Sequence, residues 1–261
     1  MPGESHQSSR APGSGEAVSI VERVTEASNA TFRALVGDLA VAYKPVRGER
    51  PLWDFPDGTL AGREVAAYAV SEALGWGIVP QTWLGAGPYG PGTLQRWCEP
   101  DPESAAVDLV PASAPREGFL VVLEGLDAQG RAVCLVHEDS AALRRIALFD
   151  VVVNNADRKG GHVLTMAGGH RYGIDHGLTF HHEPKMRTVL WGWAGAPLSR
   201  EEVQDLRSLH EALDGTLAHD LREWLSLVEV DATLARLDQL LTSGSFPTPD
   251  GQRSPIPWPP F

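Results

Sequence analysis

The order of short apolar runs in the first hundred residues constrains the fold more than any other feature of the sequence. A helical pattern runs from Gly62 to Leu74 and is ended by Gly75. β-like runs bounded by turn residues precede and follow it. They lie at 17–24, 31–38, 39–46, 78–87 and 91–100. The sequence therefore predicts a five-stranded antiparallel sheet accompanied by one helix.

The second half of the chain is mainly helical in pattern. A β-hairpin is expected just after residue 118, and a helix from about Ser140 to Phe149. The letters SREE from Ser199 resemble a capping box, and apolar residues then recur at helical spacing. Two more helices are expected near 217–227 and 231–241.

These patterns predict an α+β fold in two lobes, one rich in sheet and one mainly helical. The first lobe is expected to span 17–98 and the second 118–242. The proline-spaced stretch between them, 99–117, is expected to be an inter-lobe linker. Residues 1–16 and the proline-rich 243–261 are expected to be flexible or extended tails.

Charge and composition exclude several classes of partner. Lys and Arg number 22 against 34 Asp and Glu, and this net charge of -12 disfavours nucleic acid and anionic lipid surfaces. The chain contains no run of about 20 apolar residues, so no integral membrane association is expected. The start of the sequence lacks the apolar core of a signal peptide, which predicts a cytoplasmic protein. Cys98 and Cys134 have no metal-site spacing.

Common nucleotide and hydrolase motifs are absent from the sequence. A GxGxxG pattern occurs at Gly85, Gly87 and Gly90, but it contains Pro88 and precedes a β-like run. Because a dinucleotide-binding loop opens a helix, this pattern predicts a hairpin turn instead. The sequence contains no GxxxxGK[ST], HExxH or GxSxG pattern.

Two acidic residues stand in turns of the second half. Asp157 lies in the segment NNADRKGGH, and Asp175 lies in GIDHGLTF. Phosphoryl transfer needs one carboxylate to orient a hydroxyl, another to hold magnesium, and a cation to steady the phosphates. Lys44 at the end of a β-like run and Glu64 in the following helix supply that cation and its partner.

This order of lysine, glutamate, NxDR and IDxG resembles the phosphatidylinositol 3-/4-kinase superfamily. The segments YKPVRGERPLWDFPDGTLAGREVAAYAVSEALG, NNADRKGGHVL and GIDHGLTF are similar to an uncharacterised bacterial phosphatidylinositol-kinase-related branch. The resemblance spans about Ser28 to Trp193. It implies a two-lobed protein-kinase-like fold, ATP as a cofactor, and Mg²⁺ as its metal.

The resemblance also implies roles for individual residues. Lys44 would contact ATP phosphates and pair with Glu64. Asp157 would be the catalytic-loop aspartate, with Asn155 and Arg158 at the catalytic positions beside it. The remaining implied residues are Asp175 as a metal ligand, Ser28, Asn29 and Thr31 in a phosphate-covering loop, and Gln95 to Trp97 at an adenine-binding hinge.

His162 departs from the family pattern. The residue five after the loop aspartate is usually a metal-binding asparagine in the relatives, and here it is His162. Because neutral imidazole suits manganese or zinc better than magnesium, an altered metal preference that admits Mn²⁺ is one hypothesis. Loss of turnover is the other.

The leading interpretation is an ATP-dependent phosphotransferase that acts on an unknown, soluble hydroxyl acceptor. An ATP-binding regulator without catalysis and a nucleotidyl transferase on the same fold remain alternatives. A metallohydrolase is a further one, because histidines are frequent between 162 and 182, although they lack HxH or HxxxH spacing.

Overall fold

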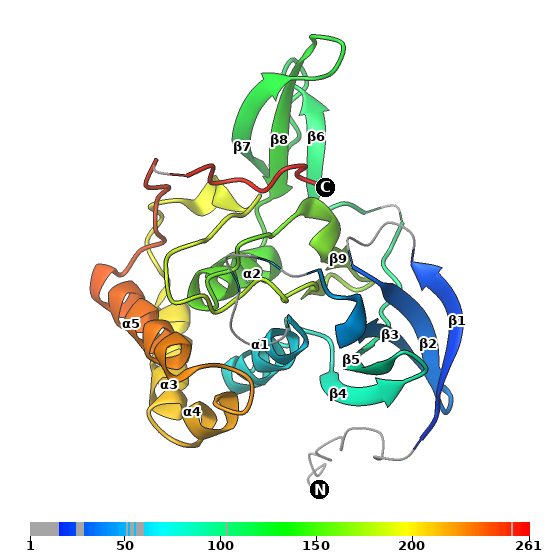
Figure 1. Cartoon of the computed structure of the whole chain (residues 1–261). Coiled ribbons are helices and arrows are strands. Elements are labelled where there is room, and N and C mark those ends of the chain that lie inside the picture. The colour runs from blue at the N-terminus through cyan, green and yellow to red at the C-terminus, as the bar shows by residue number, and fades with distance from the viewer. Residues whose placement is uncertain are drawn as a thin grey trace, which may run out of the picture.

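The computed structural model describes residues 16–24, 29–50, 52, 55, 60–102, 104–251 and 253–261. Its first half contains a five-stranded sheet in the order β1-β2-β3-β5-β4, with each neighbouring pair antiparallel. The strands are β1 (Val18–Val24), β2 (Thr31–Val36), β3 (Leu39–Pro45), β4 (Thr82–Gly87) and β5 (Gly90–Arg96). The predicted five-stranded antiparallel sheet is therefore confirmed (Figure 1).

The GxGxxG pattern forms the turn between β4 and β5. Gly87 pairs with Gly90, which leaves a two-residue turn, and Gly90 has a positive φ of 98°. A side chain at Gly87 would meet the ring of Tyr43 at 2.6 Å. The predicted hairpin is confirmed, and these two glycines serve backbone geometry and close packing.

Helix α1 (Leu60–Leu74) connects the sheet to the helical half of the molecule. Both carboxylate oxygens of Glu49 accept hydrogen bonds at its start, from the N–H groups of Leu60 and Ala61 at 3.1 and 3.0 Å. The helix contacts β4 and β5 as well as α3 and α4. Because it is covered on both sides, most of its side chains are buried.

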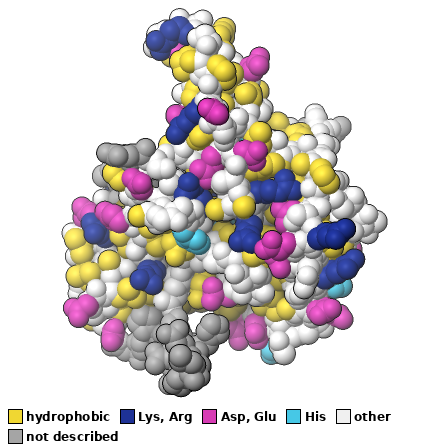
Figure 2. All heavy atoms as spheres, turned by 180° about the vertical axis from the view of Figure 1, so that it is seen from behind, with side chains coloured by type: hydrophobic (Ala, Val, Ile, Leu, Met, Phe, Trp, Pro, Cys, Tyr) yellow, Lys and Arg dark blue, Asp and Glu magenta, His cyan; other side chains and the backbone are white. Residues whose placement is uncertain are grey.

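A second sheet projects from the body of the molecule (Figure 1). It has the order β6-β8-β7, formed by β6 (Val107–Pro111), β7 (Phe119–Leu126) and β8 (Ala132–Glu138). The predicted hairpin is confirmed as β7 and β8. Residues 107–111, expected to be part of a linker, pair with β8 as a third strand. Several large hydrophobic side chains on it are about half exposed, and hydrophobic atoms are visible on this projection in Figure 2.

The helical half contains α2 (Ala141–Val152), α3 (Arg200–Leu213), α4 (Thr216–Leu221) and α5 (Leu227–Ser243). The capping box at Ser199 is confirmed, since its side chain and that of Glu202 each bond the other's backbone N–H. The short strands β9 (Val163–Thr165) and β10 (Arg171–Gly173) pair between α2 and α3. Short 3₁₀ turns are η1 (Val46–Gly48), η2 (Gly160–His162) and η3 (Trp191–Trp193).

The described residues of the C-terminal segment, 244–251 and 253–261, pack against the helical half and form no helix or strand. The N–H of Thr188 donates to the carbonyl of Pro255 at 2.9 Å, and that of Gly160 donates to Pro260 at 2.8 Å. Phe246 is buried in the main core. The tail expected here is thus extended but fixed to the body by these backbone hydrogen bonds and by the burial of Phe246. Among the described residues, no helix has the length and apolar character needed to cross a membrane.

Candidate functional site

Lys44 lies at the centre of the candidate site. Successive side chains of a strand point to opposite faces, so Tyr43 enters the core of the sheet and Lys44 projects from the other face. Its Nζ lies 2.5 Å from Oε1 of Glu64 on α1 and 3.0 Å from Oδ1 of Asp175. Burial disfavours the ammonium charge, but the carboxylates of Asp175 and Glu64 outweigh it and raise the pKa of Lys44.

Asp175 stands just after β10 in an unusual backbone conformation. Its φ is 61°, in the left-handed region that few non-glycine residues adopt. Its side chain is 47% exposed to solvent. The positive charge of Lys44 lowers the pKa of Asp175 against the opposing effect of burial. A negatively charged, accessible carboxylate therefore faces Lys44 across the cleft.

The segment NNADRKGGH is held from inside by a buried ion pair. The guanidinium of Arg158 donates from Nε and Nη2 to both carboxylate oxygens of Asp150 at 2.8 Å, and both side chains are fully buried. Its Nη1 donates to the carbonyls of His162 and Ile174 at 3.0 and 2.9 Å. Arg158 thus fixes the loop to α2 and to the turn before Asp175. The expected catalytic role of Arg158 is replaced by a positioning role, because no part of the side chain reaches the surface.

Asn155 has the same kind of role. It is fully buried, its Nδ2 donates to Oδ1 of Asp150 at 2.9 Å, and its Oδ1 accepts the N–H of Asp157 at 3.0 Å. It was also expected among the catalytic residues. Its contacts instead orient the backbone that carries Asp157.

Of the three residues of this loop that were expected to be catalytic, Asp157 alone has an accessible side chain. The carboxylate retains 26% of its exposure and lies 3.7 Å from Nζ of Lys159. Burial raises its pKa, Lys159 and Arg187 oppose that shift, and Asp175 adds to it. The electrostatic effect of Asp175 indicates that the two carboxylates lie in one site. A raised pKa makes Asp157 a better proton acceptor than an ordinary aspartate.

His162 joins the two aspartates. Its Nδ1 lies 3.0 Å from the backbone oxygen of Asp157, and its Nε2 lies 3.3 Å from Oδ2 of Asp175. Burial lowers the pKa of His162, which favours the neutral ring. A neutral imidazole donates one hydrogen, so when Nδ1 donates to Asp157 the lone pair of Nε2 faces a carboxylate oxygen.

That arrangement fits a metal ion. Adjacent ligands of an octahedral ion with bonds of about 2.1 Å are about 3 Å apart, close to the separation of the His162 and Asp175 atoms. In the described part of the chain, no three His, Cys, Asp or Glu side chains are grouped to hold a metal ion. Magnesium commonly takes one or two protein ligands and completes its shell with phosphate oxygens and water. Two protein ligands, such as Asp175 and His162 would provide, fall within that range.

A small cavity of about 50 Å³ lies over Lys44. Asn29, Thr31, Glu64 and Asp175 also line it. The second carboxylate oxygen of Glu64 is buried and has no hydrogen-bond partner among the described residues. A buried acceptor of this kind indicates a missing polar partner, such as water or a ligand group. The cavity is large enough for part of a phosphate chain but not for a nucleotide, since ligand pockets are roughly 300–1,000 Å³.

The structure does not bring every expected residue to this cavity. Ser28 lies outside the described residues. Gln95 is buried and donates to the hydroxyl of Thr82 at 2.8 Å, and the indole of Trp97 donates to Glu99. Neither Gln95 nor Trp97 lines the cavity. Lys44, Glu64, Asp157, His162 and Asp175 form the site, with Asn29 and Thr31 at its edge.

Sequence reasoning missed two buried residues beneath the site. Asp150 interrupts the apolar run ALFDVVV, and an acid among apolar residues signals a buried partner. His176 is fully buried, and its Nε2 lies 2.7 Å from Nη2 of Arg158. Burial and then the charge of Arg158 keep the pKa of His176 well below its ordinary value. The neutral ring therefore accepts a hydrogen bond from the guanidinium and completes its set of partners.

The fold and site thus define an α+β protein with a lysine, two aspartates and a histidine in one cleft. No family model matches the chain. The chain belongs to the same family as Protein Rv2133c of Mycobacterium tuberculosis (strain ATCC 25618 / H37Rv). The two are 49% identical over 257 residues, which cover 94% of this chain and 92% of the relative.

Two solved structures have a related arrangement. The crystal structure of the golgi casein kinase aligns with a TM-score of 0.49 and 14% identity, over 91% of this chain and 77% of that one. The Helicobacter pylori proinflammatory kinase CtkA aligns with a TM-score of 0.47 and 11% identity, over 89% of this chain and 94% of that one. Because both TM-scores are below 0.5, neither similarity assigns an activity or a substrate here.

Proposed function

We propose that this protein is an ATP-dependent phosphotransferase of the phosphatidylinositol 3-/4-kinase-like type, acting in the cytoplasm on a soluble hydroxyl acceptor. The observation that carries the proposal is the contact of Lys44 with both Glu64 and Asp175, beside the loop of Asp157. An accessible cation held between carboxylates from a helix and a turn suits the phosphates of a nucleotide. The acidic chain favours a soluble acceptor over an anionic membrane surface.

Each residue of the site has a distinct task in this proposal. Lys44 holds the phosphates of ATP, and Glu64 fixes the direction of its ammonium group. Asp175 and His162 hold the magnesium ion, which supplies positive charge against the charge of the transferred phosphoryl group. Asp157 accepts the proton of the attacking hydroxyl. The buried partners Asp150, Asn155 and Arg158 keep Asp157 in place before substrate arrives.

The test is nucleotide binding and turnover measured on the same preparations. Calorimetry should show ATP binding in the presence of magnesium, weakened at least about tenfold in Lys44→Met, which loses a charged hydrogen bond. Asp157→Asn should bind ATP normally and lose about 10²–10⁴-fold in turnover, the range for one general base. Glu201→Gln removes an exposed carboxylate and should match the wild type.

The outcomes separate the proposal from its alternatives. ATP binding without turnover in the wild type would favour the alternative of an ATP-binding regulator. His162 makes this alternative a specific one, because it replaces the usual metal-binding asparagine. Mass spectrometry of modified acceptors distinguishes an added phosphate from an added AMP, the product of nucleotidyl transfer. If Lys44→Met bound ATP as the wild type does, the site would be misassigned.

His162 gives the proposal a metal-dependent test. The ratio of turnover with manganese to turnover with magnesium should be higher in the wild type than in His162→Asn, because imidazole suits manganese and asparagine restores an oxygen ligand. Titration of each metal against ATP turnover measures this ratio. An equal ratio in both proteins would exclude His162 as the source of metal preference.

A further inference from the structure

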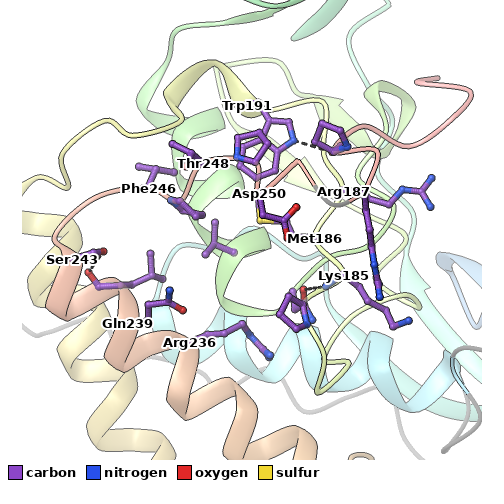
Figure 3. Close-up of a pocket in the computed structure, with 18 of the residues that line it drawn as sticks. Lys185, Met186, Arg187, Trp191, Arg236, Gln239, Ser243, Phe246, Thr248 and Asp250 are labelled. Atoms are coloured by element: carbon purple, nitrogen blue, oxygen red, sulfur yellow. Dashed lines mark hydrogen bonds between the residues drawn. The ribbon is translucent and has the colours of Figure 1, made fainter.

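A second pocket lies apart from the small cavity over Lys44. It has a volume of about 700 Å³, within the range of small-molecule sites. Its walls are the end of α2, the segment 182–187, Trp191 with Gly195, one face of α5, and the C-terminal residues 245–250 and 253–255. Figure 3 shows Arg236 and Gln239 on α5, across the pocket from the segment that carries Lys185, Met186 and Arg187.

The charge of this pocket is opposite to that of the whole protein. Its basic residues are Lys185, Arg187, Arg236 and Arg253, with His182 beside them, and its acidic residue is Asp250. The chain as a whole has 34 acidic and 22 basic residues. Because a cleft concentrates the field of its charges, this local excess of cations attracts anions despite the net charge of -12.

Arg236 is held in place by neutral groups. Its Nε donates to the carbonyl of Val152 at 2.9 Å and its Nη2 to the hydroxyl of Thr233 at 2.8 Å. It forms no ion pair with a carboxylate of the described residues. Burial lowers the pKa of Arg236 to about 10. The charge of Glu229 partly opposes this shift, and an anion in the pocket would add a second counter-charge.

Arg187 is the second cation of the pocket, and its charge also acts on Asp157, whose pKa it lowers. Within the described part of the chain its guanidinium makes no hydrogen bond or ion pair, and its buried Nε has no partner. Its backbone is firmly placed, since its N–H donates to the carbonyl of Asn155 at 2.9 Å and its carbonyl accepts the N–H of Arg158 at 3.0 Å. A fixed backbone with an unused guanidinium is a ready donor for a phosphate, sulfate or carboxylate.

The rest of the pocket wall is apolar and aromatic. Met186, Trp191, Leu240 and Phe246 line it. The indole N–H of Trp191 donates to the carbonyl of Pro255 at 2.8 Å, which fixes the ring against the C-terminal segment. The pocket therefore offers a rigid aromatic surface next to two cations, which suits a molecule with a ring and a charged group.

We propose that this pocket binds a small organic anion, with a phosphate, sulfate or carboxylate held by Arg236 and Arg187 and an aromatic or apolar body packed against Trp191 and Phe246. Lys44, Glu64 and Asp175 do not line this pocket, although Arg187 also acts on Asp157. The proposal stands whether or not the protein transfers phosphate. Neutral molecules of the same shape lack the charge that the two arginines need. Inorganic phosphate lacks the body that the aromatic wall needs.

Phenyl phosphate is the probe that carries both features. Calorimetry on the full chain should show saturable binding of phenyl phosphate, at least about tenfold tighter than phenol or inorganic phosphate. The indole ¹H–¹⁵N signal of Trp191, assigned by its loss in Trp191→Phe, should shift with the same saturation curve. No binding, or equal binding of the three compounds, would overturn the proposal.

Matched variants locate the binding. Arg187→Gln and Arg236→Gln should each weaken phenyl phosphate at least about tenfold, the loss of one charged hydrogen bond. The guanidinium of Arg187 makes no hydrogen bond or ion pair with the described residues, so this variant serves as the test if Arg236→Gln folds poorly. Arg131→Gln, an exposed arginine on the projecting sheet, should bind as the wild type does. Unchanged affinity in Arg187→Gln would place the ligand elsewhere.

Competition with ATP separates this proposal from the proposed function. Phenyl phosphate should bind Lys44→Met with unchanged affinity, because Lys44 does not line the pocket. If phenyl phosphate bound but ATP did not turn over, the pocket would stand and the phosphotransferase would fail. If magnesium ATP displaced phenyl phosphate and Lys44→Met abolished its binding, the probe would occupy the cleft and the pocket proposal would fail.

Discussion

Replacing Asp150 by asparagine tests the buried pair that holds the Asp157 loop. In the native protein its two oxygens accept hydrogen bonds from Arg158 and Asn155, and Asp150 and Arg158 are both fully buried. The substitution keeps the volume but leaves a buried guanidinium without its counter-charge. Breaking such a pair costs about 3–5 kcal/mol. Since about 1 kcal/mol shifts the melting temperature by about 2–4 °C in a domain of some 200 residues, the expected loss is roughly 6–20 °C.

Differential scanning calorimetry measures this shift directly. Glu201→Gln is the matched control, because its ion pair with Arg145 at 2.8 Å is solvent exposed and such pairs contribute about 0–1 kcal/mol. If Asp150→Asn melted within about 2 °C of this control, the buried pair would not be what holds the loop.

Three further substitutions address separate parts of the molecule. The free energy of unfolding should fall as pH drops from about 7 to 5.5, because burial lowers the pKa of His137 and the unfolded chain takes up a proton below its ordinary pKa of about 6.5. Denaturant titrations at several pH values should show a weaker dependence of this free energy on pH in His137→Gln. Gly160→Ala would place a methyl group 2.5 Å from the ring of Phe261 and should destabilise the protein by about 1–3 kcal/mol. Hydrogen exchange in the C-terminal segment should be faster in this variant. Gly161→Ala is its control, because a methyl group there meets nothing within 4 Å. Ser199→Ala removes the N-cap of α3 and should lower the free energy of unfolding by about 0.5–2 kcal/mol; no change would show that Glu202 suffices for the cap.

The sheet and its single helix could be predicted from the sequence because both depend on local patterns. Turn residues separate the β-like runs, and Gly75 ends the helix that Leu74 completes. Strand β6 could not be predicted. Its sequence VDLVP is short and lies among prolines, and it is a strand because β8 offers it a partner. Pairing with a distant segment leaves no local signal.

The candidate site divides in the same way. The resemblance implies the pairing of Lys44 with Glu64, whereas the contact of Lys44 with Asp175 is a finding of the structure. The buried roles of Asn155 and Arg158 do not, because a sequence pattern identifies a loop without stating which of its side chains face inward. The sequence does not predict the 700 Å³ pocket either, since its walls come from five segments between residues 151 and 255.

The ion pair between α1 and α5 has a consequence for how the two halves respond to heat. Arg63 on α1 donates from Nη2 to Glu229 on α5 at 2.6 Å and from Nη1 to the carbonyl of Thr179 at 2.6 Å, and both charged side chains are almost fully buried. Separating the halves would break this buried pair and its hydrogen bonds, and would expose to water the apolar surface packed around it. The sheet and the helices should therefore unfold together in one cooperative transition, and partial opening would be a rare state of the whole protein.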